Sequence, residues 1–78
     1  MNDWTQEQLA AAVKAYRWMQ GRVGRGLQVN KAQLYRDLSA KHGRTAKAWE
    51  YRMQNISHVL QLLNKDWLDG LRPAKNVG

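Results

Sequence analysis

Residues 45–64 have the sequence TAKAWEYRMQNISHVLQLLN, and the spacing of their apolar side chains decides the fold. Those side chains recur at steps of four, three, four and three residues, at Trp49, Met53, Ile56, Leu60 and Leu63. Such steps bring side chains to one face of an α-helix, so the stretch carries a continuous apolar stripe. The stripe predicts a helix over about residues 45–63 that packs this face against a core.

The opposite face of this predicted helix is polar and chemically mixed. It carries Lys47, Glu50, Tyr51, Gln54, His58 and Gln61, with Asn55 and Ser57 on its edges. A face that only meets water is more often built from Glu and Lys pairs four residues apart. Amide, imidazole and ammonium groups are typical of helices that contact base edges and phosphates. Two interpretations, a DNA-contacting face and a solvated face, stay open at this point.

The chain begins with a strong helix-start pattern. Thr5 is a good N-cap, and Gln8 stands where it completes a capping box. Trp4 and Leu9 flank this start and can pack together as a hydrophobic staple. The pattern predicts a helix over about residues 5–22. Its inward face is expected to carry Leu9, Ala12, Val13, Tyr16 and Met19.

The sequence GRVGRG at residues 21–26 contains three glycines and ends that helix. It is not a nucleotide-binding loop, because it follows a helix and no Lys-Ser or Lys-Thr pair closes it. We interpret the segment as a connector. The alternative is that Arg25 reaches a nucleic-acid backbone from it.

A second helix start follows the connector. Asn30 is the expected N-cap, and Gln33 stands at the capping-box position. A helix over about residues 31–42 should follow, and Gly43 is a good residue to end it. Thr45 is then the N-cap of the long helix. The inward side chains of the second helix are expected to be Leu34, Tyr35 and Leu38.

Two helices joined by a short glycine-containing turn, with another helix in front, match helix-turn-helix organisation. We therefore expect one all-α domain over residues 1–78, a small three-helix bundle of helix-turn-helix type. Residues 65–78 should form an irregular tail that packs back on the bundle, with Trp67, Leu68 and Leu71 as anchors. The tail is also expected to cover Trp18, which lies opposite Leu9 on the first helix. A partner contact at Trp18 is the alternative.

Charge is the strongest compositional signal, because thirteen Lys and Arg face six Asp and Glu, a net charge of +7. The segment from Lys14 to Lys47 contains one acidic residue, Asp37, among nine basic ones. These are Lys14, Arg17, Arg22, Arg25, Lys31, Arg36, Lys41, Arg44 and Lys47. A basic stripe in a small domain favours a polyanionic partner, normally nucleic acid.

Other classes of function find little support in the composition. The chain has no cysteine, and His42 and His58 are far apart without a carboxylate cluster, so we expect no metal site and no cofactor. No nucleophile–base or carboxylate pair is visible, so we expect a protein that is not an enzyme. An apolar run long enough for a membrane span and a signal peptide are both absent from the sequence, which predicts a cytoplasmic protein.

Three groups of residues carry a resemblance to a known family. They are EYRMQNIS at 50–57 after Arg44-Thr45, the tail with Trp67-Leu68, Gly70-Leu71 and PAKNVG at 73–78, and the opening Trp4-Thr5 with Glu7 and Tyr16. This pattern resembles the N-terminal module of McrA-like, modification-dependent HNH restriction endonucleases. The resemblance implies a DNA-targeting role, ahead of recognition domains and a C-terminal nuclease domain in a parent chain.

The chain departs from that family in three respects. The HNH nuclease constellation does not occur in these residues. Ala48 stands where a small hydroxyl residue is expected, and His58 where a small apolar one is expected. These departures leave the detailed contact list of the family open for this chain.

The main hypothesis is a double-stranded DNA-binding module, with plain or cytosine-modified DNA as partner. The residues expected to face the groove are Lys47, Tyr51, Gln54, Asn55 and His58. Arg44 and Thr45 should meet phosphate at the start of the long helix, where backbone N–H groups favour an anion. Backbone contacts are also expected from Arg25, Lys31 and Lys41. The alternative is a protein-interaction or dimerisation module whose surface is formed by Trp18, Tyr51, Leu62 and Trp67.

Overall fold

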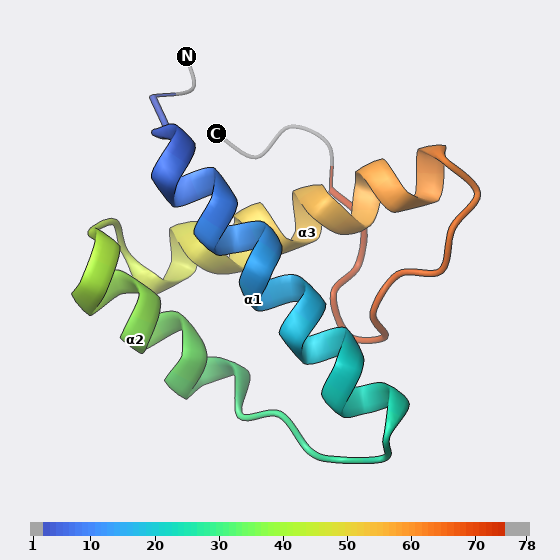
Figure 1. Cartoon of the computed structure of the whole chain (residues 1–78). Coiled ribbons are helices and arrows are strands. Elements are labelled where there is room, and N and C mark those ends of the chain that lie inside the picture. Colours follow the sequence, from blue (N-terminus) through green and yellow to red (C-terminus); the bar gives the residue numbers. More distant parts are fainter. Residues whose placement is uncertain (1–2, 75–78) are drawn as a thin grey trace.

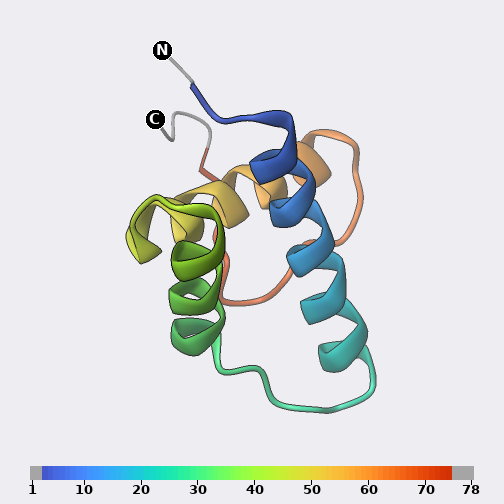
Figure 2. The ribbon, with the colours of Figure 1, turned by 60° about the vertical axis from the view of Figure 1, so that its left-hand side comes forward.

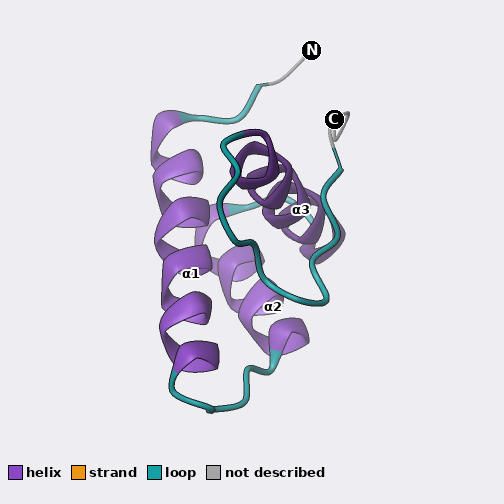
Figure 3. Cartoon of the chain, turned by 90° about the vertical axis from the view of Figure 1, so that its right-hand side faces the viewer, coloured by secondary structure: helices purple, strands orange, loops and turns teal. Residues whose placement is uncertain are grey.

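The computed structural model describes residues 3–74 and contains three helices, α1 (Gln6–Gly24), α2 (Lys31–His42) and α3 (Ala46–Leu62) (Figure 1). Between residues 3 and 74 there is no strand. Helices α1 and α2 lie side by side and run in opposite directions, and α3 crosses them (Figure 2). After α3 the chain loops away and returns along it (Figure 3). The expected all-α three-helix bundle is therefore confirmed.

The helices begin where side chains cap them. Thr5 Oγ1 accepts a hydrogen bond from Gln8 N at 3.0 Å, and Gln8 Oε1 accepts one from Thr5 N at 3.1 Å, which is the expected capping box. Asn30 Oδ1 accepts from Gln33 N at 3.1 Å, but the Gln33 side chain turns away to donate to Asp37 Oδ1 at 2.8 Å. The second start is therefore a single cap and not the box that the spacing predicts.

The core lies where α3 meets the other two helices and the tail. Its buried apolar residues are Ala12, Ala15, Tyr16, Met19, Tyr35, Trp49, Met53, Leu68 and Leu71. Of the predicted stripe on α3, Trp49 and Met53 are fully buried, and Ile56 and Leu60 are partly buried against the core. Leu63 is 59% exposed, so its predicted burial is wrong. The reason is that α3 ends at Leu62, and the chain turns away at Leu63.

The inward face of α1 is also rotated from the expected one. Val13 is exposed, whereas Ala15 is buried. On a helix Ala15 lies on the other side of Ala12 from Val13. This is the side on which Ala15 helps to line a groove shared with α2. The core of α1 is therefore shifted toward α2, and Val13 is left facing solvent.

A buried hydroxyl pair joins α1, α3 and the tail. Tyr16 Oη and Ser57 Oγ lie 2.8 Å apart, and Leu68 N donates to Tyr16 Oη at 2.9 Å. Ser57 is 0% exposed, although the helical pattern places it at the edge of the apolar face. The tail covers this flank, because Leu68 and Leu71 pack into the core.

Of two further expectations for the tail, one is partly met and the other is wrong. Trp67 is half-buried, while its neighbour Leu68 is a core residue. Trp18 is 50% exposed and lines a groove with residues of α2, so its predicted cover by the tail is wrong. The remainder of the expected tail, residues 75–78, lies outside the described residues.

We predict that Tyr16→Phe lowers the free energy of unfolding by about 1–3 kcal/mol, because it leaves the buried Leu68 N–H and Ser57 Oγ without a partner. Urea unfolding followed by circular dichroism measures this change. Tyr51→Phe is the matched control, since that phenol is exposed, and we expect a change within about 0.5 kcal/mol. Equal midpoints for the two variants would show that the hydroxyl network contributes nothing.

Candidate nucleic-acid interface

Three cationic residues line a hollow between α2 and α3. The hollow has a volume of about 290 Å³ and is lined by Lys31, Ala32, Tyr35, Arg36, Ala46, Lys47 and Glu50. Glu50 is the one carboxylate in this lining, and its Oε1 lies 3.0 Å from Lys47 Nζ. Lys31 and Arg36 have no carboxylate beside them in the hollow, so this surface attracts an anion.

The turn between α2 and α3 fixes the two walls of this hollow. Gly43 and Arg44 both adopt positive φ, at 85° and 67°. Trp49 Nε1 donates to Gly43 O at 2.8 Å, and the Ser39 hydroxyl donates to Arg44 O. Thr45 Oγ1 then caps α3 by accepting from Ala48 N at 3.1 Å. These bonds set where α3 begins, and hence where Lys47 projects beside α2.

The surface continues outward along α3. Lys47 Nζ lies 5.1 Å from the centroid of the Tyr51 ring, a cation–π contact at the start of the exposed stripe. Its hydrogen bond to Glu50 raises the pKa of Lys47, so the ammonium stays charged. Asn55 and His58 follow on the same side of the helix, both half-buried. Asn55 Oδ1 accepts from an Arg52 guanidinium nitrogen at 3.2 Å, and its amide nitrogen keeps its hydrogens to donate.

Gln54 lies on the flank that the tail approaches. Its carbonyl oxygen accepts from Ala74 N at 3.2 Å, and its side chain is half-buried. A helix centred on Ile56 would turn Gln54 further outward than Asn55. The buried residues of α3 are Trp49, Arg52, Met53 and Ser57, and the tail meets the helix on the Ser57 side, where Gln54 lies and Asn55 does not. Asn55 is therefore the better candidate for an outward contact.

Arg44 is held by the N-terminal segment of the protein. Its guanidinium donates to Asp3 Oδ1 at 3.0 Å and to Gln8 Oε1 at 3.1 Å, and it stacks on the Trp4 ring at 4.3 Å from the centroid. The hydrogen bond from Arg44 lowers the pKa of Asp3. These contacts commit Arg44 to the fold, so the expected phosphate contact at this residue is not favoured.

Arg52 stacks on Trp4 as well, with its guanidinium carbon 4.6 Å from the ring centroid. Burial, and then the neighbouring charge of Arg44, lowers the pKa of Arg52. The edge of Trp4 meets Trp49, with ring centroids 4.9 Å apart. The Asp37 carboxylate accepts from Gln33. Arg52 is thus positioned by an aromatic ring, and Asp37 is paired with Gln33 instead.

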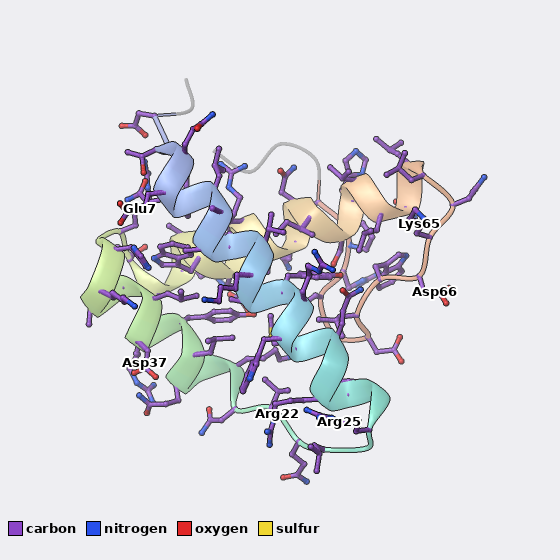
Figure 4. The ribbon with its side chains drawn as sticks, in the orientation of Figure 1. Glu7, Arg22, Arg25, Asp37, Lys65 and Asp66 are labelled. Carbon is purple, nitrogen blue, oxygen red and sulfur yellow. The ribbon has the colours of Figure 1, made fainter. Side chains whose placement is uncertain are left out.

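The remaining candidates are spread over the molecule. Arg25 lies beyond the end of α1, next to Arg22 and away from α3 (Figure 4). Lys41 lines the groove on the α1 side of α2. Lys31 and Lys47 thus line the same hollow, and Lys47 contacts Tyr51, whereas Arg25 and Lys41 lie elsewhere. The Lys31 ammonium itself lies close to Gly70 of the tail. Arg36 was missed as a site residue, although it follows the core residue Tyr35 and therefore borders the α3 side of α2.

No group of three or more His, Cys, Asp or Glu side chains that could hold a metal ion occurs among the described residues. Two side chains of the types that bind metals do lie close together, with His42 Nδ1 3.5 Å from Glu7 Oε1. Each helix within residues 3–74 is too short or too polar to cross a lipid bilayer.

Tyr35, which lines the hollow, makes the free energy of unfolding depend on pH. The residue is 5% exposed, and its hydroxyl has no hydrogen-bond partner among the described residues. Burial, with smaller effects of Glu50 and Tyr16, raises the pKa of Tyr35 to about 12. The unfolded chain ionises tyrosine near pH 10, so the folded protein binds more protons than the unfolded one between pH 10 and 12. The free energy of unfolding must therefore fall as pH rises through this window.

We predict that Tyr35 contributes about 2 kcal/mol to this fall, and that Tyr35→Phe removes that part. Urea unfolding at pH 9, 10, 11 and 12 measures it. Tyr51→Phe removes an exposed phenol and should leave the fall nearly unchanged. If Tyr35→Phe and the parent lose stability in parallel, burial of the phenol is not the cause.

No protein-family model matches this chain, and neither does any curated protein or any solved structure.

Proposed function

We propose that this chain is a double-stranded DNA-binding module that uses the face formed by α2 and α3. The observation that carries the proposal is that Lys31, Arg36 and Lys47, from two helices, line one hollow whose lining contains a single carboxylate. A cationic surface built from two rigid helices suits the regularly spaced phosphates of a duplex.

The phosphate contacts are assigned to α2. Lys31 begins this helix and Arg36 lies five residues further on, about 140° around it, and both residues line the hollow. One guanidinium nitrogen of Arg36 donates to Gln33 Oε1 at 3.0 Å, which leaves other N–H groups for an anion. Such contacts fix the orientation of a protein on DNA and do not depend on base sequence.

The base contacts are assigned to the outer stripe of α3. Tyr51, Asn55 and His58 follow Lys47 at steps of four, four and three residues, so one side of the helix presents all of them. The major groove admits an α-helix, and an asparagine amide can pair with the edge of adenine. Helices α2 and α3 then act as a helix-turn-helix pair, with α3 in the groove.

The biological setting proposed for this module is restriction of foreign DNA. The resemblance to McrA-like endonucleases supports a targeting domain that acts with a nuclease domain in a parent chain, and cytosine-modified DNA as the preferred duplex. A methyl group in the major groove can be recognised by apolar contact. The Tyr51 ring, exposed on the outer stripe, offers such a contact.

One observation favours a second candidate, a dimerisation module. Val59, Leu62 and Leu63 are exposed together at the end of α3, and Leu62 is 69% exposed. The surface expected for this alternative is not continuous, because Trp18 lies in the α1–α2 groove and Leu62 at the end of α3. A dimer would therefore form through the end of α3 alone.

We predict that the protein binds duplex DNA with an affinity that falls steeply with salt. If about three to five phosphates are neutralised, the slope of log K against log[salt] is roughly −3 to −4.5. Fluorescence anisotropy with plain and cytosine-modified duplexes, from about 50 to 200 mM salt, measures both the slope and the preference. A flat response contradicts DNA binding. Concentration-dependent mass in sedimentation without DNA binding supports the dimer instead.

We predict different losses for the two parts of the interface. Lys31→Ala and Arg36→Ala should weaken binding to all duplexes about equally and make the salt slope shallower by roughly one each. Asn55→Ala should weaken the preferred duplex by ~1–3 kcal/mol and leave scrambled duplexes nearly unchanged. Lys65→Ala is the matched control, because Lys65 lies past the far end of α3 (Figure 4). Equal losses for Lys65→Ala and Arg36→Ala would show diffuse attraction without a defined face.

A further inference from the structure

A second groove lies on the other side of α2, between α2 and α1. It has a volume of about 370 Å³, and residues of these two helices line it. Its apolar floor is formed by Ala11, Ala15, Trp18, Leu34 and Leu38. Trp18 is the largest of these side chains and is 50% exposed. A half-exposed tryptophan in the lining of a groove is typical of binding surfaces, where this residue type is enriched.

The spacing of the floor residues indicates a seam for another helix. Ala11, Ala15 and Trp18 recur at steps of four and three on α1, and Leu34 and Leu38 are four apart on α2. This stripe on α1 overlaps the one that faces the core, because Ala15 is a core residue together with Ala12, Tyr16 and Met19. The apolar face of α1 is therefore wider than packing on the core alone requires. Its outer edge, at Ala11 and Trp18, and the partly buried leucines of α2 line a common groove that the described residues leave open.

The charged residues around the groove indicate the charge of a segment that could bind there. Lys14 of α1 and Lys41 of α2 flank the apolar floor, and both are exposed. The guanidinium carbon of Arg22 lies 5.2 Å from the centroid of the Trp18 ring, but Arg22 lines the hollow next to this groove and not the groove itself. Asp37 lines an adjoining hollow, where its carboxylate accepts from Gln33. An apolar floor between cations complements a segment with apolar residues on one face and carboxylates beside them.

We infer that the α1–α2 groove is a docking site for an acidic amphipathic helix of a partner protein. Apolar side chains of that helix at steps of three and four pack on Trp18, Leu34 and Leu38. Its flanking carboxylates pair with Lys14 and Lys41. A polyanion without apolar groups would leave the floor exposed to water, which is why a peptide fits this groove better than nucleic acid.

This site is separate from the proposed DNA-binding face. The groove uses the side of α2 that carries Leu34, Leu38 and Lys41, and the hollow uses the side that carries Ala32 and Arg36. A bound helix and a bound duplex therefore touch opposite sides of α2. The docking site stands whether or not the protein binds DNA.

The test uses a synthetic peptide of about five helical turns, with leucines at positions i, i+3, i+4 and i+7 and glutamates elsewhere. One control peptide has glutamine in place of glutamate, and another has the same composition in scrambled order. Calorimetry with the full chain should give binding of the first peptide, at least ~10-fold weaker binding of the glutamine peptide, and none of the scrambled one. Equal binding of the scrambled peptide overturns the inference, because attraction would then need no apolar stripe.

Variants of the protein locate the peptide. Trp18→Ala should weaken binding by about 10–30-fold, and Lys14→Glu combined with Lys41→Glu by at least ~10-fold. Leu62→Ala and Lys65→Glu are controls that truncate an exposed apolar side chain and reverse one charge elsewhere, and both should bind as the parent does. Far-UV circular dichroism checks that each variant folds. Equal losses for Leu62→Ala and Trp18→Ala would place the peptide at the end of α3 and overturn the inference.

NMR spectroscopy of the parent protein tests the site without any substitution, because amide chemical shifts change where the peptide binds. Shifts confined to α1 and α2 around Trp18 are expected, and shifts along α3 would contradict the site. A duplex added to the complex should leave these shifts in place. If the duplex displaces the peptide and perturbs Trp18, the groove binds nucleic acid and the inference fails. Loss of DNA binding with retention of peptide binding would sink the proposed function alone.

Discussion

The structure depends on one buried hydroxyl, that of Tyr16. It accepts the Leu68 N–H and pairs with the Ser57 hydroxyl, so α1, α3 and the tail meet at a single oxygen atom. Buried polar groups are stable when they are hydrogen-bonded, and here each of the three groups has a partner. A small domain has a modest core, so closing it with a tail matters more than it would in a larger protein. The tail supplies Leu68 and Leu71, and the hydroxyl holds it in register.

A second constraint positions the candidate site. The Trp4 ring contacts the guanidinium groups of both Arg44 and Arg52, and it forms a T-shaped pair with Trp49. Arg44 has a left-handed backbone conformation, which costs a non-glycine residue about 1 kcal/mol or more. Its contacts to the N-terminal segment offset this cost. The turn that it occupies sets the angle between α2 and α3. The cationic hollow is therefore held in shape by residues that do not line it.

Local signals in the sequence predicted the local structure well. The caps at Thr5, Asn30 and Thr45 are present, and the helices begin and end within two residues of the expected bounds. Burial was predicted less well where the partner is distant in sequence. Ser57 is buried because Tyr16, forty-one residues away, pairs with it. For the same reason the sequence assigned Arg44 to phosphate, since nothing near it in the chain shows that Asp3 and Trp4 reach it.

Helix α2 has only twelve residues, yet it borders both candidate binding surfaces, the cationic hollow and the α1–α2 groove. One flank lines the cationic hollow, the other flank lines the groove with Trp18, and Tyr35 faces the core. A narrow outer strip formed by Gln33, Asp37 and Ala40 is exposed and lies opposite the core. Substitutions during evolution would therefore be tolerated best on this strip. Elsewhere on α2, most single substitutions would alter one of the two candidate binding surfaces or the packing of Tyr35 in the core. We therefore expect the sequence of this helix to change more slowly in evolution than its solvent exposure alone would suggest.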